Sequence, residues 1–332
     1  MRKQLVFAVA GGGSLAAGGS LALRYRHDID AGRARLAAVG RTAISTAFGA
    51  VEYADRGAGE PVLAIHGIFG GCDQGLLSVD DLLPGRRMIA PSRFGYLGSA
   101  LPPGGSPADQ ADAYAALLDG LGIASADVIA FSAGATSALQ LALRHPGRVR
   151  HLAVMSGNWP GSHTADHQPQ ANRLLVRSEL PMWAVATFAR PVMPRLLGVP
   201  KGLPLTGADT RTVTGLISSI FPVVPRAEGV IFDFFVSNPD VNNYDLVAVT
   251  VPTLIVHARD DPLISYDTAR RAAARIPGAR LVTVGHGGHP LLGQQDAIRA
   301  ELASFLEKPG PATTRPAPAS KRSRRAARPG TS

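Results

Sequence analysis

Short apolar runs alternate with longer amphipathic segments along most of this chain, and no other feature restricts its possible folds as strongly. The apolar runs, which are the expected strands, cover residues 47–53, 62–66, 88–90, 127–131, 149–155, 253–257 and 280–284. The amphipathic segments, which are the expected helices, cover residues 107–121, 133–145, 265–276 and 293–306. Strands joined through helices form a parallel sheet, and right-handed crossovers place helices on both of its faces. The sequence therefore predicts an α/β fold with a doubly wound, mostly parallel sheet.

One long interval, residues 158–246, breaks this alternation. It is interrupted by prolines and holds many of the large apolar residues, namely Trp159, Met182, Trp183, Phe188, Phe221, Phe232, Phe234 and Phe235. A mainly helical cap, inserted between two strands with its apolar side chains over a pocket, is expected here. The expected organisation is an N-terminal segment with a linker (1–35), a core (36–157 and 247–307), the cap (158–246) and a disordered tail (308–332).

The positive charge of the chain lies at its two ends. Of 34 basic and 25 acidic residues, residues 1–35 hold six and two, and residues 308–332 hold seven and none. This leaves 21 basic and 23 acidic residues in 36–307, a net charge of −2. Electrostatic binding of nucleic acid needs a clustered positive face, so we expect no nucleic-acid binding by the globular part.

The N-terminal segment is long enough to meet a membrane. Residues 5–23 carry no charge, lie between basic residues, and would extend about 28 Å as a helix. An uncleaved membrane anchor and a signal peptide cleaved near Ser20 and Ala22 are both possible, and five glycines and two serines leave open a segment that never enters a membrane. A membrane-anchored or exported protein is expected, on an undetermined side of the membrane.

The first candidate catalytic residue is Ser132, at a predicted junction between a strand and an Ala-rich helix. The residues two before and two after it, Ala130 and Gly134, are small, as a sharp turn between strand and helix requires. Such a turn exposes the serine hydroxyl above the sheet and directs the helix N-terminus at it. Ser132 is therefore the predicted nucleophile.

A glycine-rich loop, His66-Gly67-Ile68-Phe69-Gly70-Gly71, follows another strand. Its glycines allow the backbone to approach the nucleophile turn, so that the amides of Ile68 and Ala133 can form an oxyanion hole. We expect His66 to fix the loop by a hydrogen bond rather than to act as a base. Cys72 is the only cysteine, so the chain can form neither an intrachain disulfide nor a cysteine-rich metal site. We expect Cys72 to be a buried or loop thiol.

The acid and the base are expected after the next strands. Asp260 and Asp261 follow a buried strand, and we favour Asp261 because an apolar Pro-Leu-Ile run fixes the chain after it, with Asp260 as the second choice. His289 opens the final helix and is the predicted general base, whereas His286 stands among glycines and is expected to line the site.

The order Ser, Asp, His, each at a strand end and with a His-Gly loop upstream, resembles the α/β-hydrolase superfamily over residues 51–305. The resemblance is to its branch of lidded esterases, lactonases and carbon–carbon-bond hydrolases. It implies a triad of Ser132, Asp261 and His289 beneath a cap. The residues expected to line the substrate pocket are His66, Phe69, Phe131, Trp159, Trp183 and His286. The sequence departs from the family pattern at Ala130, Ala258 and Ser92, where Gly, Gly and Asp are common.

The expected function is a serine hydrolase that cleaves an ester, thioester or lactone through an acyl-enzyme, with no metal or organic cofactor. A small to medium apolar acyl compound is the expected substrate, and the oligomeric state is open. Carbon–carbon bond hydrolysis or cofactor-free peroxidation on the same triad is a second possibility, and a non-catalytic binder of apolar ligands is a third.

Overall fold

One eight-stranded sheet forms the centre of the computed structural model, which describes residues 2–162, 173, 175–189 and 192–307, with side chains from residue 19 onward. The strand order is β1-β2-β4-β3-β5-β6-β7-β8. The strands are β1 (Arg41–Thr46), β2 (Gly49–Arg56), β3 (Pro61–Ile65), β4 (Arg87–Pro91), β5 (Ala126–Phe131), β6 (Val149–Met155), β7 (Thr253–Ala258) and β8 (Arg280–Val284). β2 pairs antiparallel with β1 and β4, and all other pairs are parallel. The predicted fold class is confirmed.

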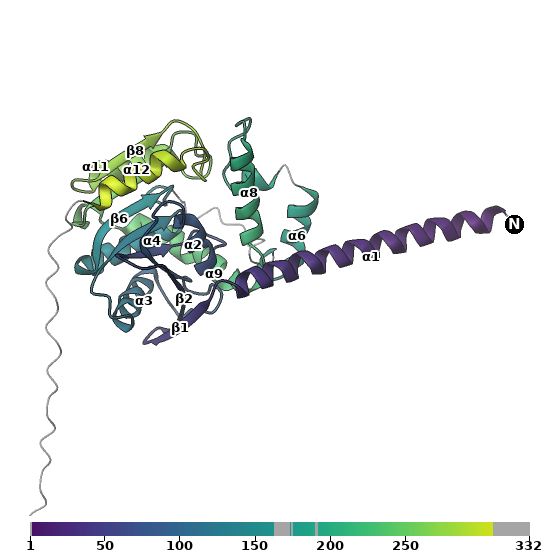
Figure 1. Cartoon of the computed structure of the whole chain (residues 1–332), viewed down its shortest axis with the longest axis horizontal. Helices are drawn as coiled ribbons and strands as arrows, with labels where there is room; N and C mark the ends of the chain where they lie inside the picture. The colour runs from purple at the N-terminus through teal and green to yellow at the C-terminus, as the bar shows by residue number, and fades with distance from the viewer. Residues whose placement is uncertain (1, 163–172, 174, 190–191, 308–332) are drawn as a thin grey trace, which may run out of the picture.

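Helices cover both faces of this sheet (Figure 1). One face packs against α3 (Pro107–Gly120), α4 (Gly134–Arg144) and α11 (Tyr266–Arg275), and the other against α2 (Cys72–Val79) and α12 (Gln295–Leu306). Because side chains alternate along a strand, Val128 and Ala130 of β5 enter the first core and Ile129 enters the second. Both sides of the central strands are therefore buried, which explains why they read as continuous apolar runs.

The structure corrects the prediction at β1 and α2, which the sequence pattern missed. The expected first strand at residues 47–53 is the second strand of a hairpin, and it is preceded by β1. β1 is the exposed edge strand, with polar residues such as Arg41 and Thr42, so it shows no apolar run. α2 has only eight residues, with Gly75 in the middle, and is too short to give a clear helical period.

The segment between β6 and β7 is helical in its described part. It contains α6 (Glu179–Phe188), α7 (Met193–Leu196), α8 (Gly207–Ser219), α9 (Ala227–Phe232), a π-helical turn (Asp233–Ser237), α10 (Asn238–Asp240), and 3₁₀ turns at Val224–Arg226, Val241–Asn243 and Leu246–Ala248. α9 is fixed to the core, since the amide of Gly229 donates to the carbonyl of Gly95 at 2.9 Å and that of Leu97 donates to Pro225 at 2.6 Å. We call residues 158–246 the cap; residues 163–172, 174 and 190–191 lie outside the description.

The N-terminal helix α1 (Arg2–Ala37) extends away from the rest of the molecule (Figure 1). Its last turns pack on the cap, where Ile29 is buried in one cluster with Trp183 and Phe221. Asp28 accepts a hydrogen bond of 2.9 Å from the indole of Trp183, and Arg35 donates to the carbonyl of Phe221 at 2.7 Å. The predicted boundary at residue 35 therefore falls inside a helix whose C-terminal half is joined to the cap.

The described residues contain no single helix that is long and apolar enough to cross a membrane. One bent pair, Gly207–Ser219 with Val224–Asn243, meets the requirement only in length and composition. The predicted membrane segment, residues 5–23, falls mostly among the first 18 residues, whose side chains lie outside the description, and so does the predicted tail at 308–332.

Candidate active site

Ser132 occupies a strained turn between β5 and α4. Its φ is +49°, in the left-handed region, which costs a non-glycine residue on the order of 1–3 kcal/mol. Three backbone hydrogen bonds hold it there: its amide donates to the carbonyl of Met155 at 3.1 Å, and its carbonyl accepts the amides of Asn158 at 3.1 Å and Ala135 at 3.0 Å. A Cβ at Gly134 would lie 2.6 Å from the carbonyl oxygen of His66, so only glycine fits at this position. The small residues around Ser132 thus permit the turn that the sequence predicted.

The structure brings Ser132, His289 and Asp261 together. Oγ of Ser132 lies 2.9 Å from Nε2 of His289, and Nδ1 of His289 lies 2.8 Å from Oδ2 of Asp261. Because an ionised carboxylate only accepts hydrogen bonds, Nδ1 carries the proton of the neutral imidazole and Nε2 is free to accept the proton of the serine hydroxyl. The three side chains therefore form a path for proton transfer away from Ser132.

Asp261 is buried and remains ionised. Burial by itself would raise the pKa of Asp261, but hydrogen bonds from His257 and His289 lower it well below its usual range. Oδ1 accepts the amides of Leu263 at 2.8 Å and Ile264 at 3.0 Å. His257 is a residue that the sequence reasoning missed; its Nε2 lies 3.0 Å from the carbonyl of Ile264 and 3.3 Å from Oδ2 of Asp261.

The loop that carries His289 is held from three sides. Asp260, the second-choice acid, accepts hydrogen bonds from the amides of Gly287 and Gly288, at 3.2 and 2.9 Å. Ser156, which follows β6 with a φ of +47°, donates to the carbonyl of His289 at 2.7 Å. The amide of His289 donates to the carbonyl of Gly198 in the cap at 3.0 Å. The two neighbouring aspartates therefore differ in function: Asp261 contacts the imidazole, and Asp260 fixes the loop.

The glycine-rich loop lies against the nucleophile. A Cβ at Gly67 would lie 3.3 Å from Cβ of Ser132, so the backbone passes close to the serine. Ala133 is almost fully buried at the start of α4, and Ile68 is half-buried on the facing loop. In the described part of the chain, neither of these two amides donates to another backbone carbonyl. The loop that carries Ile68 thus passes beside Ser132, and the role of the Ile68 and Ala133 amides as oxyanion donors stays a prediction.

His66 is a fixed structural residue of this loop. Its Nδ1 lies 2.7 Å from the carbonyl of Gly67, and its Nε2 accepts the amide of Arg93 at 2.9 Å. Burial and the neighbouring charge of Arg93 lower the pKa of His66 well below its usual value. The imidazole is therefore neutral and fully engaged in hydrogen bonds, so it is not available as a base.

We expect this buried histidine to make folding pH-dependent. Above about pH 6.5, His66 is neutral in both the folded and the unfolded chain and adds no dependence. Below that pH, only the unfolded chain binds the proton, so the free energy of unfolding falls by up to ~1.4 kcal/mol per pH unit. Urea denaturation at pH 7.5 and 5.5 should show a smaller decrease for His66→Gln than for the native chain. Equal decreases in the two proteins would contradict this account.

Two buried arginines join the loop region to the cap, and no sequence pattern indicates either contact. Arg226 donates to the carbonyl of Gly70 and to both carboxylate oxygens of Asp73, the latter at 3.1 and 2.8 Å. Arg93 forms a buried ion pair with Asp233, which also accepts a 2.5 Å hydrogen bond from the hydroxyl of Tyr96. The cap therefore holds the loop that carries Ile68.

Of the residues predicted to line a pocket, some lie near Ser132 in the sequence, and others are buried in the core, contact α1 or are exposed. Phe69 lies within the glycine-rich loop, at a φ of +60°, and Phe131 directly precedes Ser132; both are half-buried. Trp159 is fully buried in the core beside α4. Trp183 contacts α1, and His286 is exposed, with Nδ1 3.3 Å from Gln294.

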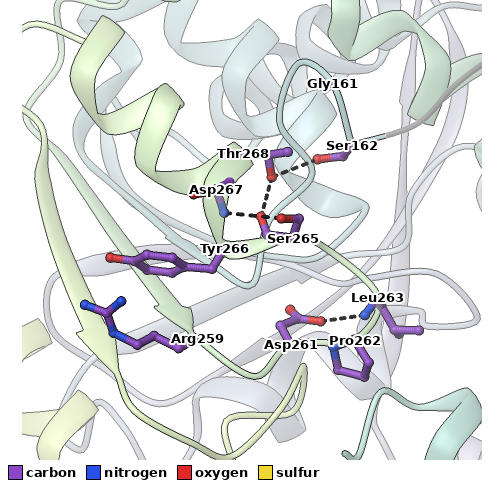
Figure 2. Close-up of a pocket in the computed structure, with 10 residues that line it drawn as sticks. All are labelled: Gly161, Ser162, Arg259, Asp261, Pro262, Leu263, Ser265, Tyr266, Asp267 and Thr268. Carbon is purple, nitrogen blue, oxygen red and sulfur yellow. Dashed lines mark hydrogen bonds between the residues drawn. The ribbon is translucent and has the colours of Figure 1, made fainter.

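A polar hollow of about 470 Å³ borders the acid side of this site (Figure 2). Asp261 lines it, together with Arg259, whose guanidinium lies 5.0 Å from the ring centre of Tyr266. Ser132 and His289 are not among its lining residues. Within the described residues, no group of three His, Cys, Asp or Glu is placed to hold a metal ion.

Two further sequence expectations concern the core beside the site. Cys72 is buried, and burial raises the pKa of its thiol to about 12. Ser92, which stands where an aspartate is common, donates to Glu52 at 3.1 Å and accepts the amide of Cys72 at 3.1 Å. The departure at Ser92 therefore changes a structural hydrogen-bond network rather than the reacting groups.

Comparison with known proteins identifies the family. The sequence model of the family described as the alpha/beta hydrolase fold matches residues 60–295, which include Ser132, Asp261 and His289. The chain belongs to the α/β hydrolase fold family. Its solved relatives include an α/β hydrolase fold protein from Nakamurella multipartita, which is 31% identical with a TM-score of 0.69, the match covering 80% of this chain and 98% of the other.

Curated relatives of this α/β hydrolase carry hydrolase names. The uncharacterized hydrolase YcgS of Bacillus subtilis is 29% identical, over 78% of this chain and 95% of that protein. The 2-hydroxymuconate semialdehyde hydrolase of Pseudomonas putida is also 29% identical, over 71% of this chain and 82% of that enzyme. The chain is therefore a hydrolase of the α/β fold.

Proposed function

We propose that this α/β hydrolase cleaves a carboxylic ester or a related acyl bond, such as a thioester or lactone, through an acyl-enzyme on Ser132. The hydrogen-bonded series from Ser132 through His289 to Asp261 carries the proposal. Few arrangements other than a nucleophile, a base and a group that orients the base require these three residue types at these distances.

In the first step, Oγ of Ser132 attacks the carbonyl carbon of the substrate while Nε2 of His289 takes the hydroxyl proton. The carbonyl oxygen becomes an oxyanion, which the amides of Ile68 and Ala133 stabilise; one such donor is worth about 2.7–4 kcal/mol of barrier. The imidazolium of His289 is stabilised by Asp261, whose lowered pKa keeps the carboxylate ionised. The imidazolium then protonates the leaving alcohol or thiol, or the ring oxygen of a lactone, and the acyl group remains on Ser132.

In the second step, water replaces the leaving group. Nε2 of His289 takes a proton from this water, whose oxygen forms the new bond to the acyl carbon. Collapse of the second oxyanion breaks the bond to Ser132, and His289 returns the proton to Oγ. The products are an acid and an alcohol or thiol, and the proposed reaction requires no metal or organic cofactor.

The proposed substrate is a small to medium apolar acyl compound, because the cap over the site is rich in apolar side chains. Carbon–carbon bond hydrolysis is the second candidate, supported by the similarity to the Pseudomonas putida semialdehyde hydrolase. Cofactor-free peroxidation uses the same triad and is a weaker alternative.

A panel of p-nitrophenyl acyl esters of increasing chain length, acyl thioesters, lactones and a carbon–carbon hydrolase substrate would test the proposal. The full chain should be used, because α1 packs on the cap. We expect saturable ester or lactone hydrolysis and covalent labelling by a fluorophosphonate probe. Cleavage of the carbon–carbon substrate alone would favour the second candidate, and a chain with neither turnover nor labelling would refute both.

We also propose that residues 5–23 place the protein at a membrane, as an anchor or before export. The uncharged run between basic residues supports this location. Fractionation of cells that express the full chain, followed by carbonate extraction and N-terminal sequencing, would separate a retained anchor from a cleaved signal peptide.

A further inference from the structure

Exposed apolar side chains gather on the cap and on the adjoining part of α1. Among the described residues, thirteen large apolar side chains are exposed, and ten of them belong to α1 or the cap: Leu21, Leu23, Leu175, Leu180, Phe188, Val192, Leu196, Leu205, Val224 and Val236. The most exposed are Leu23 at 69% and Phe188 at 65%. A gathering of this kind marks a surface that contacts a partner, whereas single exposed apolar residues carry no such meaning.

Four of these side chains lie on two short helical stripes. Leu180 and Phe188 are eight residues apart on α6, and Val192 and Leu196 are four residues apart at α7, so each pair lies on one side of its helix. We call these four residues the cap apolar face. Trp183, three residues after Leu180, is buried where α6 packs on α1, so the exposed pair lies at the edge of this contact.

The cap apolar face is continuous with α1. The ring of Trp183 contacts Phe188 at 5.9 Å and Tyr25 at 5.2 Å between ring centres. α6 lies beside α1 where that helix leaves the domain (Figure 1). Leu21, four residues before Tyr25 and therefore on the same side of α1, extends the exposed apolar surface toward the N-terminus and belongs to the uncharged segment 5–23.

The distribution of charge within the cap points to the nature of its partner. The cap as a whole is neutral, with seven basic and seven acidic residues in 158–246, but all seven basic residues and only two of the acids lie in 173–226. Of these basic residues, Arg226 is buried and paired with Asp73. One of the two acids, Glu179, is buried and accepts the amides of Val223 and Val224. Arg177 and Arg195 are exposed next to the apolar residues. Basic and apolar side chains together on one surface are the combination that binds anionic lipid.

We propose that the cap apolar face docks on the surface of a membrane that contains anionic lipid, with Leu180 and Phe188 entering the boundary between headgroups and acyl chains. Arg177 and Arg195 then lie at the level of the phosphates. This surface is distinct from the segment at residues 5–23: the cap itself touches the bilayer, and α1 sets its orientation through the contacts of Asp28 and Arg35.

Docking would bring the bilayer close to the reacting groups. α7 ends two residues before Gly198, whose carbonyl accepts the amide of His289 at 3.0 Å, and a Cβ at Gly198 would lie 2.4 Å from Cβ of His289. If the proposed hydrolase function holds, on which this step rests, an apolar acyl compound dissolved in the membrane reaches the site from the docked side without crossing water.

A fluorescent probe on the cap tests the docking directly. The full chain with Phe188→Cys is labelled with an environment-sensitive NBD dye; Cys72 is buried and burial raises the pKa of its thiol to about 12, so the new cysteine reacts selectively. With vesicles of phosphatidylcholine and phosphatidylglycerol we expect a blue shift of the emission and quenching by brominated acyl chains. With phosphatidylcholine alone the shift should be smaller.

The matched control is Val247→Cys, since Val247 is 59% exposed and precedes β7, at the opposite end of the parallel strands from Ser132. Its probe should stay in water. Equal behaviour of the two probes would overturn the proposal, because α1 alone would then hold the protein at the vesicle. A blue shift at residue 188 that grows with protein concentration in the absence of vesicles would also overturn it, in favour of a second copy of the chain on this face.

The same measurement on a chain that also carries Ser132→Ala separates docking from catalysis. The probe reports the membrane contact without turnover, so docking persists in this variant if the inference is right. Loss of the proposed hydrolysis with retained docking would refute the function and leave the membrane surface standing.

Discussion

Replacing Ser132 by alanine is expected to lower kcat for the ester or lactone substrate by about 10⁴- to 10⁶-fold and to abolish labelling by a fluorophosphonate. The substitution removes the atom that forms the acyl-enzyme, and the residual rate comes from binding and the oxyanion donors alone. Steady-state assays and gel detection of the labelled chain measure both effects. The strain at Ser132, with φ at +49°, persists in the alanine variant, so thermal unfolding should change little.

Ser137→Ala is the matched control for this experiment. Ser137 lies on α4, five residues after Ser132, and its hydroxyl donates to the carbonyl of Gly134 at 3.2 Å. We expect labelling and kcat to stay within severalfold of the native chain. Labelling that survives in the Ser132→Ala chain would identify a different nucleophile and would remove the basis of the proposed mechanism.

The sheet could be predicted well because its strands are buried on both faces. The expected strand at residues 127–131 is β5 (Ala126–Phe131), and the one at 280–284 is β8 (Arg280–Val284). Burial on both sides selects apolar residues at every position, and this pattern is visible without a structure. β1 (Arg41–Thr46) exposes most of its residues at the sheet edge, so nothing in its composition distinguishes it from a loop.

The reacting residues could also be predicted, since each follows a strand end and their order along the chain is informative. The residues that support them could not. Arg226 contacts Asp73 across 153 positions, and Ser156 contacts His289 across 133. The first contact depends on how the cap folds back over the sheet and the second on which strand ends lie side by side, and no local pattern encodes either. Trp183, placed on a pocket wall by the sequence, contacts α1 for the same reason.

Replacing Asp261 by asparagine is expected to reduce kcat by about 10⁴-fold while the fold is retained. The asparagine side chain can turn its amide toward Nδ1 of His289, which then has to accept a hydrogen bond. The proton of the imidazole moves to Nε2, where it faces the Ser132 hydroxyl and prevents the ring from taking the serine proton. Substrate binding does not use this carboxylate, so kcat should fall far more than KM rises.

Asp260→Asn separates the two neighbouring acids. Among the described residues, Asp260 accepts the amides of Gly287 and Gly288 and no hydrogen bond from an imidazole, so an asparagine oxygen can keep at least one of its bonds. We expect a loss of about 1–3 kcal/mol in stability and a decrease in kcat of about tenfold or less, because the His289 loop is held less firmly. A loss of activity in Asp260→Asn as large as that in Asp261→Asn would show that the assignment of the acid is wrong, since loop support alone does not block proton transfer from Ser132.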